Sequence, residues 1–341
     1  MDEAYIDSYG NQGTLLDLET LGDVLDLSEM DENVLHTGRL ADGTLVGAPL
    51  GGVGILSIGV NTDLLEASGV DLPEDTAWTW EHLQEACAEI GAWGKEDGVV
   101  ALDMFGQSAA ELGAWARQAG QQIFPREDET LISIDTVKEY LDYSRGLIES
   151  GAAPSASDQI EDFGAGVEQG RFGTGKAVLH LQFHTQVQTF QKASGGATMD
   201  LLRLPALDSG NPQMVNKASM HWSIAQASAE TGAAESAAAL MDFLLTDPEA
   251  AKVLKIECGV TAIPSMQDAV EPELDDIETI CLEFALTMQS EVVRAPLVTP
   301  ASGVGFGDEV TRISQTYCFG DTDLDTAAQE ILTALEGMQG E

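Results

Sequence analysis

The chain has 341 residues, with 15 Lys and Arg against 58 Asp and Glu, so its formal net charge is −43 at pH 7. This charge excludes a nucleic-acid-binding surface, which needs clustered basic side chains to contact phosphates, and it excludes a basic helix lying on a membrane. The hydrophobic content of 44% indicates a globular chain, and at roughly 100–200 residues per domain the length predicts two domains. No apolar run approaches the roughly 18 residues of a membrane span.

The acidic residues are spread along the predicted helices and loops. We interpret them as a solvated surface, because net charge describes solubility rather than fold. Few lysines with many acids suit a protein that faces high salt, where repulsion is screened within roughly 3 Å at 1 M. A cationic ligand is the alternative that composition leaves open.

Two predicted strands flank a glycine-rich break in the first part of the chain, after a short N-terminal helix. The apolar runs at 45–50 and 55–60 each predict a strand. Gly51, Gly52 and Gly54 separate them. Because glycine permits a sharp change of backbone direction, the break predicts a crossing between two sheets.

The rest of the chain alternates predicted helices with short strands. Thr79 and Asp135 are predicted N-caps, and Trp80 and Trp115 are predicted core residues, whereas the role of Trp222 stays open. Helices are predicted at 80–90, 109–119, 135–148, 159–170, 233–245, 275–288, 304–317 and 324–335, with a restart at 246–249, and strands at 99–104, 177–181, 201–205 (an edge strand) and 222–225. Interleaved strands and helices predict an α/β fold in layers.

Four cysteines are widely spaced, with no C-x-x-C pair and no spacing typical of a metal site: Cys87, Cys258, Cys281 and Cys318. They allow three full disulfide pairings, and disulfides stay possible. Cys87 and Cys281 lie in apolar helical patterns, where a buried thiol is common.

One segment imitates a phosphate-binding loop. Residues 170–176 read G-x-x-x-x-G-K, but Ala177 stands where a Mg²⁺-binding Ser or Thr is required. A phosphate loop runs from a strand into a helix, whereas here a predicted helix precedes the glycines and a strand follows. We therefore do not interpret it as a nucleotide site.

No catalytic constellation stands out. His180 and His184 are four residues apart, but the first lies in a predicted strand, so the spacing does not predict a metal pair on a helix. There is no G-x-S-x-G, and 58 carboxylates supply acid pairs at any spacing. No cofactor, metal or catalytic residue is predicted.

Several motifs together resemble one family, the solute-binding proteins of ABC importers, in the branch that carries sugars and oligosaccharides and is similar to maltose-binding protein. The family patterns are Y-x-x-x-G-x-L-x-D-L, G-x-P followed by Y-N-x-D-L-x-x-x-G, P-x-T-W-x-E-L, F-x-x-G-K-A-A-M, A-x-x-F-x-x-F-L and G-x-x-P. They match residues 9–18, 47–49 with 60–69, 73 with 79–83, 172–179, 238–245 and 259–264 in that order. The fourth match explains the imitation of a phosphate loop.

The resemblance implies a fold of two α/β lobes joined by a hinge, with ligand held in the cleft as the lobes close. It implies an N-terminal lobe of 1–52 plus 222–295 and a C-terminal lobe of 53–221 plus 296–341, with hinge crossings at 50–54, 220–223 and 295–300. In such proteins a signal peptide, a lipidated cysteine and opening strands and helices precede the first motif. We therefore expect a first lobe that is N-terminally truncated, with Met1 a fragment end or a misassigned start.

The resemblance also implies which residues face the cleft. Sugars are expected to stack on aromatic faces and to bond with a few fixed polar side chains. The implied positions are Asp2, Gly51, Gly52, Val53, Phe105, Gln107, Phe183, His184, Met220, His221, Trp222, Ser302 and Phe306.

The resemblance implies an extracytoplasmic binding protein that delivers a carbohydrate to ABC permease subunits without catalysing a reaction. It also implies a monomer that is anchored to the membrane as a lipoprotein. Two alternatives stay open. The same fold could bind a cationic or peptide solute, which the acidic charge favours, or the chain could be a carbohydrate-active hydrolase.

Overall fold

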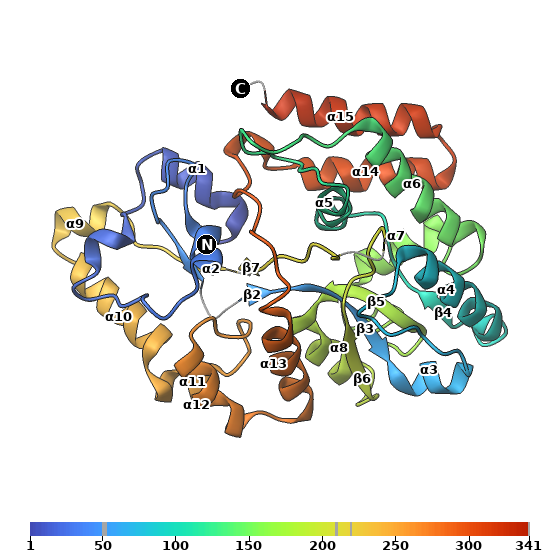
Figure 1. Cartoon of the computed structure of the whole chain (residues 1–341), viewed down its shortest axis with the longest axis horizontal. Helices are drawn as coiled ribbons and strands as arrows, with labels where there is room; N and C mark the ends of the chain where they lie inside the picture. Colours follow the sequence, from blue (N-terminus) through green and yellow to red (C-terminus); the bar gives the residue numbers. More distant parts are fainter. Residues whose placement is uncertain (50–52, 209–210, 219, 340–341) are drawn as a thin grey trace. The chain divides into compact units, whose positions relative to one another are not determined.

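The computed structural model describes residues 1–49, 53–208, 211–218 and 220–339. The chain forms two compact units (Figure 1): unit 1 is Met1–Ile55 with Val215–Val304, and unit 2 is Leu56–Met214 with Gly305–Glu341. The chain therefore passes between the units after Ile55, Met214 and Val304. Each unit is assembled from two separate stretches of sequence.

Unit 2 is built on a four-stranded mixed sheet. Its strands lie in the order β4 (Val100–Leu102), β5 (Ala177–Phe183), β3 (Leu56–Asn61) and β6 (Met199–Leu202). β4 runs parallel to β5, whereas β3 is antiparallel to both β5 and β6. The strands predicted at 55–60 and 177–181 are confirmed, and β6 is the predicted edge strand.

Helices cover the sheet of unit 2, and the first five of them begin at side-chain caps. The helices are α3 (Thr62–Ser68), α4 (Trp80–Gly94), α5 (Ala109–Gln118), α6 (Ile134–Glu149), α7 (Ala156–Ala165), α8 (Val187–Ala193), α14 (Phe306–Phe319) and α15 (Leu324–Gln339). Thr79 caps α4 as predicted, with its side chain accepting from the His82 backbone. The predicted Asp135 cap is wrong, because Ser133 caps α6 and Asp135 lies in its first turn.

The helix predicted at 159–170 is displaced. Ser155 caps α7, which therefore begins three residues earlier, at Ala156. It ends before Gly166, whose φ of +78° favours glycine and departs from the helical conformation. The apparent phosphate loop at 170–176 thus follows a helix and turns and leads into β5, as predicted.

Helices from both stretches of unit 2 pack together. α14 and α15, drawn in red in Figure 1, contact each other and α6, and α14 also contacts α5. Cys318 on α14 lies with its Sγ 3.7 Å from Ser144 Oγ on α6. Cys318 and Cys87 are free thiols, so the four cysteines do not form two disulfides.

Unit 1 combines helices with two antiparallel strand pairs. The pairs are β1 (Ala48–Pro49) with β8 (His221–Trp222), and β2 (Val53–Gly54) with β7 (Lys217–Ala218). The helical elements are η1 (Glu3–Tyr5), α1 (Ile6–Asn11), η2 (Leu18–Leu21), α2 (Glu32–Leu35), η3 (His36–Gly38), α9 (Ala227–Thr231), α10 (Ala234–Thr246), α11 (Pro248–Leu254), α12 (Pro264–Val270), η5 (Glu271–Glu273), α13 (Asp276–Met288) and η6 (Ala301–Gly303).

The strand predicted at 45–50 begins later in the structure, because β1 starts at Ala48 and Leu45 makes an isolated bridge to Arg39. Leu50 lies outside the described residues. Gly47 instead approaches Gly38, whose carbonyl accepts from the Gly47 backbone at 3.2 Å. A side chain at Gly38 would collide with the Gly47 carbonyl, so glycine is required for this approach.

One apolar core holds unit 1 together. Leu18, Leu45, Ile224, Met241 and Ile263 are among its buried members, so it joins the N-terminal stretch to the helices after residue 233. Burial of such side chains contributes roughly 1.5–3 kcal/mol each. None of the described helices of either unit is long and apolar enough to span a membrane.

Candidate ligand-binding site

The sequence-predicted site residues fall into two groups, one in each unit. Unit 1 holds Asp2, Met220, His221, Trp222 and Ser302, and unit 2 holds Phe105, Gln107, Phe183, His184 and Phe306. Gly51 and Gly52 lie outside the described residues, and Val53 is described by its backbone, which pairs with Ala218.

The N-terminal segment brings the first group together. The Met1 backbone nitrogen donates to the His221 carbonyl at 2.7 Å, and the His221 nitrogen donates back to the Met1 carbonyl at 2.7 Å. This exchange is the pattern of directly paired residues on neighbouring strands. Asp2 and Met220, each next in the chain to one of the paired residues, are therefore neighbours.

Two carboxylates hold the segment around Ser302 against the same N-terminal segment. Glu3 Oε1 accepts from the Thr299 backbone at 3.2 Å, and Asp7 Oδ2 accepts from the Ala301 backbone at 2.8 Å. Asp7, only 9% exposed, is also bonded through Oδ1 to Asn11 Nδ2 at 2.8 Å. Sequence reasoning missed these acids because bonds to residues nearly 300 positions away leave no local pattern.

His221 is buried and neutral. Thr37 Oγ1 donates its proton to the Val34 carbonyl at 2.7 Å, so at 3.0 Å from His221 Nε2 it must accept from an Nε2–H. His221 Nδ1 is then an acceptor, and it has no hydrogen-bond partner among the described residues. Burial first, and the Met1 amino group second, lower the pKa of His221 to about 4.

The low pKa of His221 predicts acid lability of unit 1. The unfolded state, with a His pKa of about 6.5, takes up the proton first as the pH falls. The contribution of neutral His221 to the free energy of unfolding is therefore complete above pH 6.5 and is lost as the pH falls toward 4. We expect the free energy of unfolding to fall by about 3 kcal/mol across this window relative to His221→Gln. Urea unfolding from pH 7 to pH 4 measures this difference.

The matched control is His82→Gln, since His82 is exposed on α4 and Gln can also complete the capping box with Thr79. This variant should follow the wild-type pH profile. If the free energy of unfolding depended on pH in the same way for the wild type and for His221→Gln, the low pKa of His221 would be contradicted.

Trp222 packs against the unit 1 core and is partly buried. Its Nε1 and the Oγ of Ser223 are buried without hydrogen-bond partners in the part of the chain that the structure describes. Such buried polar atoms are normally satisfied by protein, water or ligand. A ligand contact at Trp222 stays a prediction.

In unit 2, Phe105 lies in the core, which corrects the prediction that it faces a ligand. It is 2% exposed, and four aromatic rings surround it at centroid distances of 5.2–6.2 Å: Trp80, Trp115, Tyr140 and Tyr143. The predicted core positions of Trp80 and Trp115 are confirmed. No ring face of Phe105 is left for stacking on a sugar.

Gln107 is likewise committed to the interior of unit 2. It is 2% exposed, its Nε2 donates to Gln159 Oε1 at 2.7 Å, and its Oε1 accepts from Gln315 Nε2 at 3.1 Å. Its backbone nitrogen donates to Glu111 Oε2 at 3.1 Å. The Glu111 carboxyl thus supports the loop before α5. Burial raises the pKa of Glu111, although the hydrogen bonds that it accepts act to lower it. Because the Gln107 side chain is bonded inside unit 2, its predicted ligand role is corrected.

The remaining residues of this group differ in exposure. Phe306 is 2% exposed and meets Phe124 edge to face at 6.0 Å, and His184 is fully buried in η4 (His184–Gln186). Both are therefore interior residues rather than surface contacts. Phe183, at the end of β5, is half-buried, and its backbone donates to Gln186 Oε1 at 3.1 Å.

His180 has a structural environment. Its Nδ1 lies 2.7 Å from Asp103 Oδ1, and its ring stacks on Phe172 at 5.3 Å and 19° and meets Phe190 of α8 at 4.6 Å. No group of three His, Cys, Asp or Glu side chains is placed to hold a metal ion within the described ranges. The His180 side chain is thus held by packing and by a hydrogen bond within unit 2.

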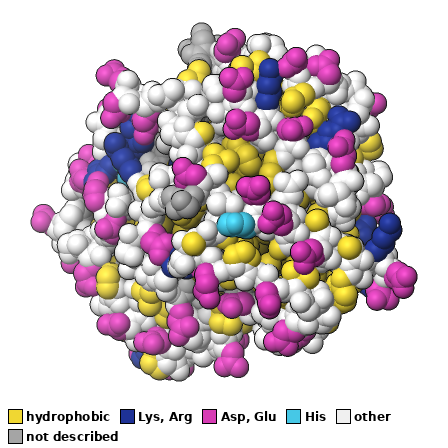
Figure 2. Space-filling view, turned by 45° about the vertical axis from the view of Figure 1, so that its right-hand side comes forward, with side chains coloured by type: hydrophobic (Ala, Val, Ile, Leu, Met, Phe, Trp, Pro, Cys, Tyr) yellow, Lys and Arg dark blue, Asp and Glu magenta, His cyan; other side chains and the backbone are white. Residues whose placement is uncertain are grey.

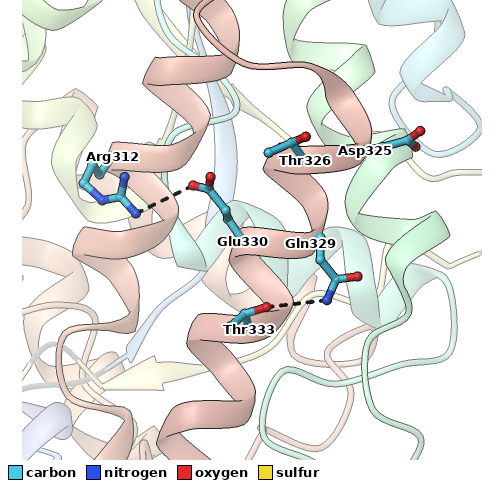
Figure 3. A pocket seen from close by; sticks show the side chains of 6 residues that line it. All are labelled: Arg312, Asp325, Thr326, Gln329, Glu330 and Thr333. Atoms are coloured by element: carbon cyan, nitrogen blue, oxygen red, sulfur yellow. Dashed lines mark hydrogen bonds and ion pairs between the residues drawn. The ribbon is translucent and has the colours of Figure 1, made fainter.

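Two surface pockets of unit 2 contain none of the predicted residues. The first, of about 500 Å³, lies along α14 and α15 (Figure 3), where Arg312 faces Glu330 at 3.9 Å and Gln329 donates to Thr333 at 3.5 Å. The second, of about 530 Å³, lies beside α3 and β6. It is lined in part by carboxylates, of which Asp75 pairs with Arg203 at 3.0 Å.

Acidic side chains are scattered over the face shown in Figure 2, among few lysines and arginines. They form no single acidic field that marks a site. This distribution agrees with the interpretation of the charge as a solvated surface.

The comparisons with known proteins identify the class. Residues 1–278 match the family described as bacterial extracellular solute-binding protein, and the chain belongs to this family. Membership places the chain outside the cytoplasm, and the family is one of binding proteins. The resemblance stated from the motifs is therefore confirmed.

Solved structures confirm the fold. A Listeria monocytogenes ABC substrate-binding protein in complex with cycloalternan matches with a TM-score of 0.77 and 20% identity, over 100% of this chain and 83% of that chain. The Streptomyces glaucescens GacH receptor, solved with acarbose, matches with a TM-score of 0.75 and 18% identity, over 98% of this chain and 81% of that chain. Maltose-bound T. maritima MalE3 matches with a TM-score of 0.74 and 17% identity, over 98% of this chain and 83% of that chain. The chain has the two-lobe α/β fold of periplasmic solute-binding proteins.

Proposed function

We propose that the protein binds a sugar or oligosaccharide between its two units and delivers it to the permease subunits of an ABC importer. The observation that carries this proposal is the family match over residues 1–278. The sugar assignment is supported by structural neighbours whose titles name maltose, acarbose and cycloalternan.

In this proposal units 1 and 2 act as the two lobes, and the three chain passages between them act as the hinge. A ligand that contacts both lobes stabilises the closed state by its differential affinity for that state. Unit 1 contributes Asp2, Met220, Trp222 and Ser302, which the N-terminal segment gathers. Unit 2 contributes Phe183.

The partner and the anchoring belong to the same proposal. A monomeric binding protein held by a lipid anchor would stay close to its permease, and the acidic surface would keep it soluble and unassociated. Binding and release without turnover is the expected chemistry, since the family is one of binding proteins.

A ligand screen tests the proposal. We expect a saturable rise in Tm with one or more of maltotriose, cellotriose, raffinose and glucose, because a ligand at 100 times its Kd stabilises a protein by about 2.7 kcal/mol. Calorimetric titration then gives the affinity, and chromatography of the sugar after incubation shows whether it is cleaved.

The same screen includes spermidine, putrescine and a tripeptide. A shift with one of these and none with any sugar would overturn the carbohydrate assignment in favour of a cationic or peptide solute. Release of shorter sugars would instead identify a hydrolase.

A further inference from the structure

Two tyrosines of unit 1 are unusually exposed for aromatic side chains. Tyr5 and Tyr9 each expose 47% of their surface. Large aromatic side chains normally contribute most when buried, so a pair left exposed on one segment requires an explanation. Sequence reasoning did not assign a role to either residue.

The local helical geometry places both rings and one carboxylate along the same side of the segment. Asp2 caps η1, and the Tyr5 nitrogen donates to the Asp2 carbonyl at 3.1 Å. In a 3₁₀ turn, side chains three positions apart eclipse one another. Tyr9 follows Tyr5 by four positions on α1, which is again the same face. We call Asp2, Tyr5 and Tyr9 the aromatic stripe.

The rings support each other without covering each other. Their centroids are 6.5 Å apart and their planes meet at 65°, an edge-on arrangement. Each tyrosine is 47% exposed beside this contact, so part of each side chain stays accessible to the apolar side of a pyranose.

Asp2 supplies a hydrogen-bond acceptor one turn before Tyr5. Its Oδ1 accepts from the Ala4 backbone at 2.9 Å, and the carboxylate is exposed. Its Oδ2 has no hydrogen bond or ion pair among the described residues. A carboxylate oxygen accepts two sugar hydroxyls readily, and bonds to a charged acceptor are roughly twice as strong as neutral ones.

The stripe is connected to the predicted site. The Met1 and His221 exchange holds Asp2 beside Met220, which is itself 39% exposed. Glu3 and Asp7 lie in the same two helical segments as Tyr5 and Tyr9, and their carboxylates accept from the backbone of the segment around Ser302. The stripe is thus fixed by bonds to two other parts of unit 1 before any ligand arrives, which lowers the ordering cost of binding.

We propose that the aromatic stripe is the sugar-binding surface of unit 1: a neutral pyranose stacks on Tyr5, its hydroxyls donate to Asp2, and Tyr9 supports the Tyr5 ring and contacts the next sugar unit of an oligosaccharide. This inference rests on the proposed function. It names a stacking residue, and it assigns a preference for chains of at least two sugars.

The test compares two substitutions at Tyr5 and one at Tyr9 by calorimetric titration, with the sugar of the panel above that the wild type binds most tightly. Tyr5→Phe keeps the ring and should bind within about threefold of wild type. Tyr5→Leu keeps apolar bulk without a ring face and should weaken binding roughly 10- to 100-fold, as loss of an anchoring aromatic does. Tyr9→Leu should weaken binding of the trisaccharide more than that of the monosaccharide.

The matched control is Phe243→Leu, because Phe243 lies in the same unit on α10 and is 49% exposed. Its affinity and its Tm without ligand should equal those of the wild type. Asp2→Asn distinguishes the ligand-binding role of the carboxylate from its capping role. Asn caps a helix as well as Asp does, so the fold should be kept. The affinity for the sugar should fall roughly tenfold, because the charged acceptor is lost.

The outcomes separate the two proposals. If the wild type binds no sugar of the panel, the proposed function fails. If the wild type binds but Tyr5→Leu binds equally tightly, or if Tyr5→Leu weakens binding only as much as Phe243→Leu does, the proposed function stands and the aromatic stripe is refuted.

Discussion

Phe105→Ala is expected to lower the free energy of unfolding of unit 2 by about 3–5 kcal/mol, the usual cost of removing a buried phenyl ring. Four aromatic rings lie around Phe105 at 5.2–6.2 Å. They come from α4, α5 and α6, so the vacated space cannot close without moving three helices. Urea unfolding followed by tryptophan fluorescence measures the loss, because Trp80 and Trp115 both contact this ring.

The matched control is Phe163→Ala, since Phe163 lies on α7 of the same unit and is 56% exposed. Its effect should stay within about 0.5 kcal/mol, as for most surface substitutions. If Phe105→Ala left stability unchanged and abolished sugar binding, the original prediction of a ligand contact would be right and the core assignment wrong.

A second large effect is expected from salt. The net charge of −43 makes the folded chain repel itself. Two like charges 10 Å apart in water repel by about 0.4 kcal/mol, and many such pairs act together on this surface. The Debye length falls from roughly 10 Å at 0.1 M to 3 Å at 1 M. If screening recovers about 3 kcal/mol, the Tm rises by roughly 6–12 °C for units of this size.

Differential scanning calorimetry in 0.1, 0.5, 1 and 2 M NaCl measures the rise. Sucrose of equal osmolality separates screening from exclusion of cosolute. A second series at pH 4.5, where many carboxyl groups are neutral, should show a smaller rise. A Tm that is flat or falls with NaCl at pH 7 would show that the acidic surface is not adapted to high salt.

Local patterns predicted most of the secondary structure. Apolar runs identified β3 and β5, and the Thr79 cap located the start of α4. These features depend on residues within one or two turns of each other. The errors at Asp135 and at 159–170 arose where two polar residues competed for one cap or where several glycines followed a helix.

The site was less predictable, because burial depends on distant residues. Phe105 and Gln107 follow a strand just as a ligand-contacting residue would, and only the rings of Tyr140 and Tyr143 or the amide of Gln315 reveal them as interior. His221 bonds to Thr37 across 184 positions. No local pattern carries such a contact.

The aromatic stripe was present in the sequence in a recognisable form. Tyr5 and Tyr9 are four positions apart and flank Ile6, which is fully buried. A buried residue directly after Tyr5 indicates that Tyr5 faces another direction.

The discontinuous construction of both units has a consequence for how the chain folds. Unit 1 needs residues 215–304 to pair with 1–55, and unit 2 needs 305–341 to complete the helix layer formed by α6, α14 and α15. During synthesis, the first stretch must therefore wait until most of the chain has been made. Contacts between such distant segments slow folding, because long loops must close first. Neither unit can therefore be completed before the second of its two stretches has been synthesised.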